Sequence, residues 1–347
     1  MTVVVTGASG HLGANLVREL RRRGRSVRAL IPPNEGFLEG LDIEQVHADV
    51  HDAASLRGVF SGAEVVYHLA AVISIEGDRT GIVWATNVDA VRRVAEQALA
   101  CRVRRMVHCS SVQAFVQEPL DEPLDETRAK VTSLSYPVYD RSKAAGEAEV
   151  RKVIAKGLDA VIVNPTGVIG PCDYGPSRMG RFFLGLYSRT VPALIAGGFN
   201  WVDVRDVVAG LLEAEARGRT GENYLLAGHW HSMKDLAAMA EQVVGVRPPA
   251  FTCPMWLARA VAPASMVYAR MVGKEARFTT DSLHALRANR HVPHDKATRE
   301  LGYQPRPTLE TVHDIYQWFA SAGRISLGSP IVNWRRGLPE SSGVATL

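Results

Sequence analysis

Cysteine is scarce in this chain and never occurs in a spacing typical of a metal or redox site. The 347 residues include four cysteines, with no C-x-x-C pair and no matching pair of histidines. We therefore expect reduced thiols, no disulfide framework and no metal. The N-terminus leads directly into an apolar run, without the basic segment of a secretory signal, which favours a cytoplasmic protein.

A strong excess of charge is also missing. The 40 Lys and Arg residues and 36 Asp and Glu residues give a formal net charge of +4, and no dense basic stretch is interleaved with aromatic residues. These features argue against a nucleic-acid partner. The longest apolar stretch, residues 255–272, is interrupted by Arg259, Pro263 and Arg270. We expect a partly buried helix there and no membrane span.

The first half of the chain alternates short β-branched runs with helical patterns. Strands that alternate with helices and are apolar on both faces indicate a parallel sheet covered on each side. The sequence thus predicts a doubly wound, Rossmann-like α/β fold with ligands at the carboxyl ends of the strands. The expected strands are residues 2–6, 26–31, 44–48, 64–69, 104–110 and 159–164, and the clearest helices are residues 86–100 and 137–156.

This regular rhythm ends near residue 170, where glycine and proline become frequent. The first 170 residues are expected to form the dinucleotide-binding domain, and residues 199–215 to return to it as a strand and the start of a helix. Residues 171–198 and 216–322 are expected to form a smaller, mostly helical substrate-binding region. The aperiodic residues 323–347 are interpreted as an extended or mobile tail.

A glycine-rich turn follows the first expected strand. Its glycines have the spacing G-x-x-G-x-x-G, and a helix follows at once. Glycine lets the backbone turn tightly and approach a pyrophosphate, and the helix N-terminus offers N–H groups and a positive dipole to the anion. A turn without a ligand is the alternative, but the strand–turn–helix context favours a nicotinamide dinucleotide. The expected contacts are Gly7, Ser9, Gly10, His11, Leu12 and Gly13.

The choice between NAD and NADP usually depends on the end of the second strand, where an acid binds the ribose hydroxyls or a basic residue accommodates a 2′-phosphate. Residues 29–34 carry neither, and Arg28 lies within the strand as a candidate. We expect NADP or NAD, with a slight preference for NADP because no acid opposes the phosphate. Asp49, with Val50 beside it, is a candidate contact for the adenine; a cap for the helix that begins near Asp52 is the alternative.

A phenol and an ammonium lie four residues apart at Tyr139 and Lys143, which places them on one face of a helix. A phenol titrates near 10, so it needs a stabilised phenolate to exchange protons at neutral pH. A nearby lysine and an oxidised nicotinamide would supply this stabilisation, and Lys143 is also suited to hold the nicotinamide ribose. Ser110 and Ser111 end the fifth strand, where one hydroxyl is suited to bind the substrate oxygen; otherwise they are turn serines.

Together these residues resemble the extended short-chain dehydrogenase/reductase family. Further segments fall in the same order as in that family: Tyr67–Ala71, Asn87–Val88, Asn164–Pro171, Val202–Asp206, Leu301–Tyr303 and Pro305. The resemblance implies that Ser111, Tyr139 and Lys143 are catalytic. It also implies that Leu69, Ala70 and Ala71 line the path of the adenosine diphosphate, and that Pro165, Thr166 and Val168 flank the nicotinamide.

Within that family, residues 164–171 are most similar to bacterial dihydroflavonol-reductase-like and 3β-hydroxysteroid-dehydrogenase-like proteins. This favours reduction of a carbonyl or oxidation of a secondary alcohol on a small hydrophobic substrate. Nucleotide-sugar epimerases and dehydratases, which recycle a bound NAD, are the alternative. They need basic residues for the substrate diphosphate, for which Arg178, Arg181 and Arg277 are candidates.

A non-catalytic NAD(P)-binding regulatory protein is a second alternative, although such relatives generally lack the Tyr/Lys pair that this chain retains. A homodimer through the helices expected at residues 86–100 and 137–156 is implied by the family resemblance.

Overall fold

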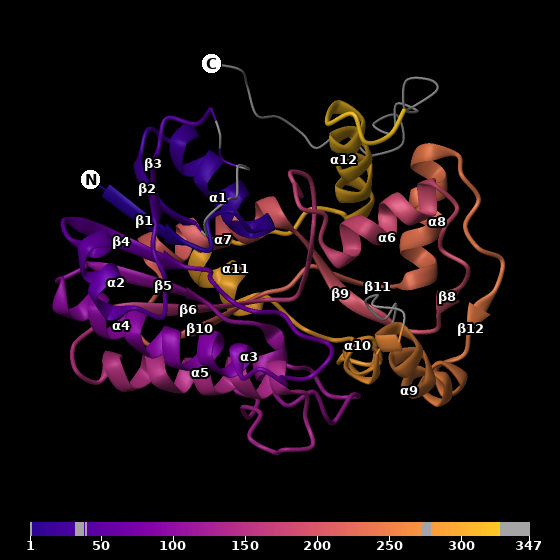
Figure 1. The fold of residues 1–347 in the computed structure, drawn as a ribbon, viewed down its shortest axis with the longest axis horizontal. Helices are drawn as coiled ribbons and strands as arrows, with labels where there is room; N and C mark the ends of the chain where they lie inside the picture. Colours follow the sequence, from indigo (N-terminus) through magenta and orange to yellow (C-terminus); the bar gives the residue numbers. More distant parts are fainter. Residues whose placement is uncertain (1, 32–37, 39, 272–278, 327–347) are drawn as a thin grey trace.

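The computed structural model describes residues 2–31, 38, 40–271 and 279–326, without the side chains of residues 267–270. Seven strands form one sheet in the order β3-β2-β1-β4-β5-β6-β10, and every neighbouring pair is parallel (Figure 1). This confirms the predicted doubly wound fold. The strands are β1 (Thr2–Thr6), β2 (Ser26–Ile31), β3 (Glu44–His47), β4 (Ala63–His68), β5 (Arg105–Cys109), β6 (Ala160–Pro165) and β10 (Asn223–Leu226).

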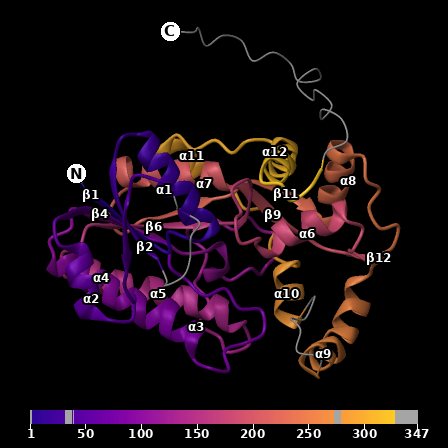
Figure 2. The same ribbon diagram turned by 45° about the horizontal axis from the view of Figure 1, so that its top comes forward.

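Helices cover both faces of the sheet because successive strand residues point to opposite sides. Val3 and Val5 of β1 belong to one core cluster, whereas Val4 belongs to the cluster on the other face. On the first face lie α1 (His11–Arg22), α7 (Val204–Arg217) and α11 (Asp295–Leu301). On the second lie α2 (Ala53–Phe60), α4 (Val91–Ala100) and α5 (Val138–Ile154), as Figure 2 shows.

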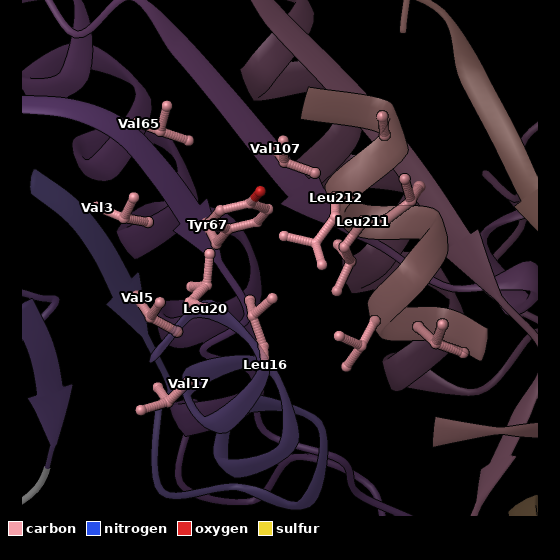
Figure 3. Packing of buried hydrophobic residues seen from close by; sticks show 14 of the residues in the cluster. Val3, Val5, Leu16, Val17, Leu20, Val65, Tyr67, Val107, Leu211 and Leu212 are labelled. Atoms are coloured by element: carbon pink, nitrogen blue, oxygen red, sulfur yellow. The ribbon is translucent and has the colours of Figure 1, made fainter. Parts of the chain in front are cut away.

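Figure 3 shows Tyr67 of β4 in the first of these cores, with Leu16 and Leu20 of α1 on one side and Leu211 and Leu212 of α7 on another. The whole Tyr67 side chain is buried, so its hydroxyl needs a partner inside the protein. It donates to the carboxylate of Glu215, which also forms ion pairs with Arg25 and Arg104. Each large apolar side chain buried here contributes about 1.5–3 kcal/mol to the stability of the domain.

The expected strands of the first half agree with the observed ones to within a residue at each end. The return to the sheet differs from the expectation. Residues 199–203 belong to β9 (Gly198–Asp203), which pairs with β7 (Gly167–Ile169) and β11 (His229–Ser232) in a separate sheet. The seventh strand of the main sheet is instead β10, which covers the edge of β6. Only α7 returns as expected, because its apolar face packs on α1.

The expected helix at residues 86–100 is continuous but irregular. It comprises α3 (Ile82–Trp84), a π-helical turn η1 (Ala85–Ala90) and α4. The π turn lies against α5, where the carbonyl oxygen of Asn87 would be 2.3 Å from a Cβ at Gly146. Glycine at position 146 therefore lets α5 approach this turn closely.

A second lobe lies beside the carboxyl ends of the strands, on the right in Figure 1. It encloses its own core, which includes Phe183, Leu236 and Tyr316. Among the residues described, no helix is long and apolar enough to cross a membrane. Most of the expected tail, residues 327–347, lies outside the described residues. The remaining elements of this lobe are α6 (Arg178–Tyr187), β8 (Leu194–Ile195), α8 (Met233–Val244), β12 (Thr252–Cys253), α9 (Met255–Met271), α10 (Thr280–Ala285) and α12 (Thr308–Ser321).

Candidate active site

The glycine turn joins β1 to α1, and its three glycines are not equivalent. Gly7 has a φ of +68°, and a Cβ there would lie 2.6 Å from the backbone nitrogen of Ala70. A Cβ at Gly13 would lie 2.1 Å from the carbonyl oxygen of Gly7. Gly10, by contrast, is exposed, and its nearest neighbour would be the same oxygen at 3.4 Å. Gly7 and Gly13 let the turn fold against the sheet, and Gly10 leaves its outer side open.

The N-terminus of α1 opens toward this space. Gly10 is its N-cap residue, no side chain of the described residues caps the helix, and no acidic residue lies in its first turn. The first N–H groups of a helix lack intrahelical partners and carry the positive end of the dipole. An open backbone cradle of this kind fits the pyrophosphate of a dinucleotide. Ser9 is half-buried beside it.

Residues 69–71 lie beside the turn because the ends of β1 and β4 are bonded to one another. The Thr6 hydroxyl is hydrogen-bonded to Nδ1 of His68 at 2.7 Å, and the Leu69 amide donates to the Thr6 carbonyl at 3.2 Å. Asn87 then holds the following loop, since its side chain donates to the carbonyl of Val72 and accepts from its amide, each at 2.9 Å. In a doubly wound sheet ligands bind where the strand order reverses, which is here between β1 and β4.

The three expected catalytic residues converge at the carboxyl end of β5. Tyr139 lies in the first turn of α5, and its hydroxyl is hydrogen-bonded to the side chain of Ser111. The Ser111 hydroxyl also accepts from the amide of Gln113 at 3.2 Å. One turn further along α5, the Lys143 ammonium donates to the carbonyl of Cys109 at 3.0 Å. The structure thus brings together the phenol, hydroxyl and ammonium that the sequence singled out.

Burial dominates the pKa of Tyr139 when only the protein side chains surround the phenol. Burial raises the pKa of Tyr139, and its hydrogen bond with Ser111 lowers the pKa only partly. Lys143 does not act on it here because the ammonium is directed to the end of β5. Burial also lowers the pKa of Lys143. The side chains alone therefore keep the phenol protonated at neutral pH.

A buried polar network positions Ser111 from behind. The Asn164 amide donates to the carbonyl of Ser111 at 3.0 Å and to the carboxylate of Glu147 at 2.6 Å. Glu147 is 1% exposed; it also accepts from Asn223 at 3.0 Å and pairs with Lys130 at 2.6 Å. Their role in positioning Ser111 was not predicted from the sequence. The one sequence signal for this network is the position of Glu147, which lies one helical turn after Lys143 on the same face of α5.

The residues expected to flank the nicotinamide lie at the end of β6 and in β7. Pro165 ends β6, and the Thr166 hydroxyl donates to the side chain of Asn200 at 3.0 Å. Val168 lies in β7 and packs on the first core. The same segment anchors α1, because His11 is hydrogen-bonded to the Pro171 carbonyl at 3.0 Å. Leu12 packs on the first core as well.

Arg28 is not brought to the phosphate turn. Its guanidinium pairs with Glu44 at 2.7 Å and donates to the carbonyls of Val59 at 2.6 Å and Ser61 at 3.1 Å. These carbonyls lie at the end of α2, just before β4 begins, and therefore near the amino ends of the strands. The expected candidate for a 2′-phosphate is thus used for packing at the opposite edge. Residues 32–37, which follow β2, lie outside the described residues.

Asp49 is exposed, and its side chain accepts from the amide of His51 at 2.9 Å. The cap of α2 is Asp52 and not Asp49. Val50 is half-buried against the second core. Of the three candidate arginines for a substrate diphosphate, Arg181 donates to the Pro176 carbonyl at 2.8 Å and Arg277 lies outside the described residues.

A second titratable pair, which was not predicted from the sequence, joins α5 to the other lobe. Nε2 of His284 in α10 lies 3.6 Å from Oδ2 of Asp140, and neither atom has a hydrogen-bond partner among the described residues. Burial and the charge of Asp281 raise the pKa of Asp140 to about 8, and burial lowers the pKa of His284. No group of three or more metal-ligating side chains occurs in the described part of the chain.

The comparisons with known proteins agree with this geometry. The sterol demethylase protein B of Methylococcus capsulatus is 34% identical over 330 residues, which cover 94% of this chain and 100% of that protein. The putative dihydroflavonol 4-reductase of Synechocystis is 31% identical over 331 residues, covering 92% of this chain and 95% of that protein. The crystal structure of gox2253 has a TM-score of 0.82 at 34% identity, and the match covers 94% of this chain and 99% of that one.

The family assignment rests on the first two-thirds of the chain, which contain the glycine turn, the main sheet and the three residues expected to be catalytic. Residues 3–227 match the model of the NAD dependent epimerase/dehydratase family. This match confirms the resemblance to extended short-chain dehydrogenases and reductases. The chain therefore belongs to the NAD-dependent epimerase/dehydratase family, and it is an NAD(P)-dependent oxidoreductase.

Proposed function

We propose that this enzyme reduces the carbonyl group of a small hydrophobic substrate, or oxidises the corresponding secondary alcohol, and exchanges its cofactor in every turnover. The observation that carries the proposal is the convergence of Tyr139, Ser111 and Lys143 at the end of β5. The bound cofactor would supply or accept the hydride at the substrate carbon. The open backbone cradle of residues 7–13 would hold its pyrophosphate.

The protein side chains would bind the substrate oxygen and move one proton. The Ser111 hydroxyl would orient the oxygen, and the Tyr139 hydroxyl would donate its proton to that oxygen in reduction and take it back in oxidation. Burial raises the pKa of Tyr139, so the phenol is protonated at neutral pH and suits the donor role. Lys143 would hold the nicotinamide ribose, and its positive charge would stabilise the phenolate left after transfer.

Two observations favour this reading over a nucleotide-sugar dehydratase. Elimination of water needs an acid and a base in addition to the hydride-transfer machinery. The two residues that follow Ser111 in the short helix η2 (Val112–Ala114) are Val112 and Gln113, and neither exchanges protons at neutral pH. In addition, the names of the two relatives refer to a sterol and a dihydroflavonol, which are hydrophobic molecules.

The cofactor is proposed to be NADP, although Arg28 no longer supports this. The remaining support is that the last residues of β2 carry no acid to repel a 2′-phosphate. A cytoplasmic homodimer through α4 and α5 is proposed on the family resemblance and the free cysteines.

The first test is the state of the cofactor in the purified enzyme. We expect an empty protein that binds NADPH reversibly and oxidises it when hydrophobic ketones are added. Stoichiometric NAD that survives purification, together with no turnover of ketones, would favour the recycling epimerase or dehydratase reading.

The second test is Tyr139→Phe, which removes the phenol but keeps the ring. We expect turnover to fall by about 10²–10⁴-fold with unchanged NADPH affinity. Tyr136→Phe is the matched control, because its hydroxyl donates to Glu118 and is not bonded to Ser111. Equal turnover in the Tyr139 variant and the wild type would remove Tyr139 from the mechanism, and would leave the family and the fold untouched.

A further inference from the structure

A pocket of the second lobe lies outside the catalytic trio. Its volume is about 370 Å³, which is enough for a small organic molecule. It is formed between the loop that follows η2, the N-terminus of α9 and the segment that follows α10. Its lining includes Leu120, Trp230, Met255, Leu286, Arg287 and Arg290.

One part of this pocket is apolar and closely built. A Cβ at Gly197 would lie 3.1 Å from the terminal methyl of Met255 and 2.9 Å from the carbonyl oxygen of Leu286, so glycine is needed for the wall to close. Leu120, which also lines the pocket, is 42% exposed. Large apolar side chains that face a hollow indicate a ligand with an apolar body.

The polar side chains of the lining are donors. The guanidinium of Arg290 lies 4.6 Å from the ring centroid of Trp230, and Nε1 of Trp230 is buried without a hydrogen-bond partner among the residues described. No acidic side chain is among the described residues that line the pocket, and both lining arginines are exposed. Two arginines near the start of α7 are instead neutralised by carboxylates: Arg205 pairs with Asp203 at 2.7 Å, and Arg306 pairs with Asp206 at 2.8 Å.

Two walls of the pocket continue to the catalytic centre. The loop that carries Leu120 follows η2, whose N-cap residue is Ser111. The side-chain amide of Asn289 holds this loop by donating to the carbonyls of Pro119 at 3.3 Å and Glu122 at 2.7 Å. The other wall is α10 and its continuation, where His284 faces Asp140, the neighbour of Tyr139. Two segments that line the pocket are therefore connected along the chain to residues beside the proposed catalytic trio.

We propose that this pocket binds the anionic end of the substrate, which is a hydrophobic ketone or secondary alcohol that carries a carboxylate or a comparable acidic group. The inference rests on the proposed function and specifies its substrate class. Arg287 and Arg290 bind the acidic group, because a guanidinium matches the planar geometry of a carboxylate. Leu120, Met255 and Leu286 contact the apolar body.

Binding is tested by calorimetry, without turnover, on the full-length enzyme saturated with NADPH. The probes are dodecanoate and cholate, which pair a linear or a ring-shaped apolar body with a carboxylate, and their uncharged methyl esters. At least one acid should bind, and its ester should bind about tenfold more weakly or worse. In the double variant Arg287→Gln/Arg290→Gln, the affinity for the acid should fall by about the same factor, and the affinity for the ester should not change.

Arg299→Gln is the matched control, since Arg299 is 69% exposed on α11 and does not line the pocket. It should bind the acid like the wild type, and all variants should keep the wild-type NADPH affinity and melting temperature. The inference is overturned if neither acid binds, if acid and ester bind equally, or if the double variant and the control behave alike. If uncharged ketones are turned over as well as acidic ones, the proposed function stands and this inference fails.

Discussion

The two lobes hold their functional groups by different means. In the sheet lobe, Ser111 and Lys143 are buried and are held by hydrogen bonds to the backbone or from it. In the second lobe, Arg287 and Arg290 are exposed, and the pocket they line is assembled from segments far apart in the sequence. The proposed catalytic side chains thus contribute to the stability of their lobe, whereas the arginines that line the pocket contribute little.

This difference indicates which substitutions affect folding and which affect recognition. Removing a partner from a buried polar network leaves another polar group unsatisfied, which is costly. Replacing an exposed side chain usually changes stability by little. Substitutions behind the catalytic trio should therefore destabilise the protein, and substitutions around the pocket should change its choice of substrate.

The largest effect is expected when Glu147 is replaced, because this breaks the polar network that holds Ser111. Glu147→Ala leaves Lys130 and the amides of Asn164 and Asn223 without their carboxylate. The free energy of unfolding should fall by about 3–5 kcal/mol, as measured by urea denaturation. Glu149→Ala on the same helix removes only an ion pair with the exposed Lys152 and should cost less than about 1 kcal/mol. Equal losses would show that the network does not stabilise the lobe.

The next effect concerns the phosphate turn. Gly7→Ala places a Cβ against Ala70 at a positive φ, so the turn must move. We expect NADPH affinity to fall by about tenfold or more, since the left-handed backbone alone costs alanine ~1–2 kcal/mol. Gly24 also has a positive φ, of +71°, but open space surrounds it. The Gly24→Ala variant should therefore be slightly destabilised and should keep normal NADPH affinity. Fluorescence titration measures both, and a Gly7 variant that binds normally would refute the assigned cradle.

A smaller effect is expected from Asp140, which faces His284 of the second lobe. Its pKa is about 8 in the folded protein against 3.8 for the free side chain, so between these values unfolding releases a proton. The free energy of unfolding should therefore fall as the pH rises, by about 2 kcal/mol from pH 6 to pH 8. Asp140→Asn should abolish this contribution.

The control for this pH dependence is Asp52→Asn. The pKa of Asp52 is lowered by hydrogen bonds at the start of α2, so the group is ionised throughout the range from pH 6 to pH 8. Its variant should keep the wild-type slope. Identical slopes for Asp140→Asn and the wild type would place Asp140 in contact with water.

The smallest effect is expected at Arg28. Arg28→Gln should change the ratio of NADPH to NADH affinity by less than about twofold, because the side chain is bound at the amino ends of the strands. Titration with both cofactors measures the ratio. A change of tenfold in favour of NADH would mean that Arg28 reaches the 2′-phosphate after all.

Much of the fold followed from local pattern, and the errors have physical reasons. The strands up to β6 were predictable because buried parallel strands are continuous apolar runs. The return to the sheet was misassigned because β9 and β10 are both short apolar runs, and only their hydrogen-bonded neighbours distinguish them. Sequence spacing placed Lys143 on the same face of α5 as Tyr139, but it did not show that the ammonium donates to the carbonyl of Cys109.

The sequence by itself determined the sheet of the nucleotide-binding lobe and the glycine turn, and it singled out the three residues that we propose to be catalytic. These features depend on residues close together in the chain, or on strand ends that a parallel sheet necessarily brings to one edge. Only the tertiary structure decided the network around Glu147, the contact between Asp140 and His284, and the pocket beside Arg287 and Arg290. Each of these joins segments from different parts of the chain, and no periodic pattern encodes such contacts.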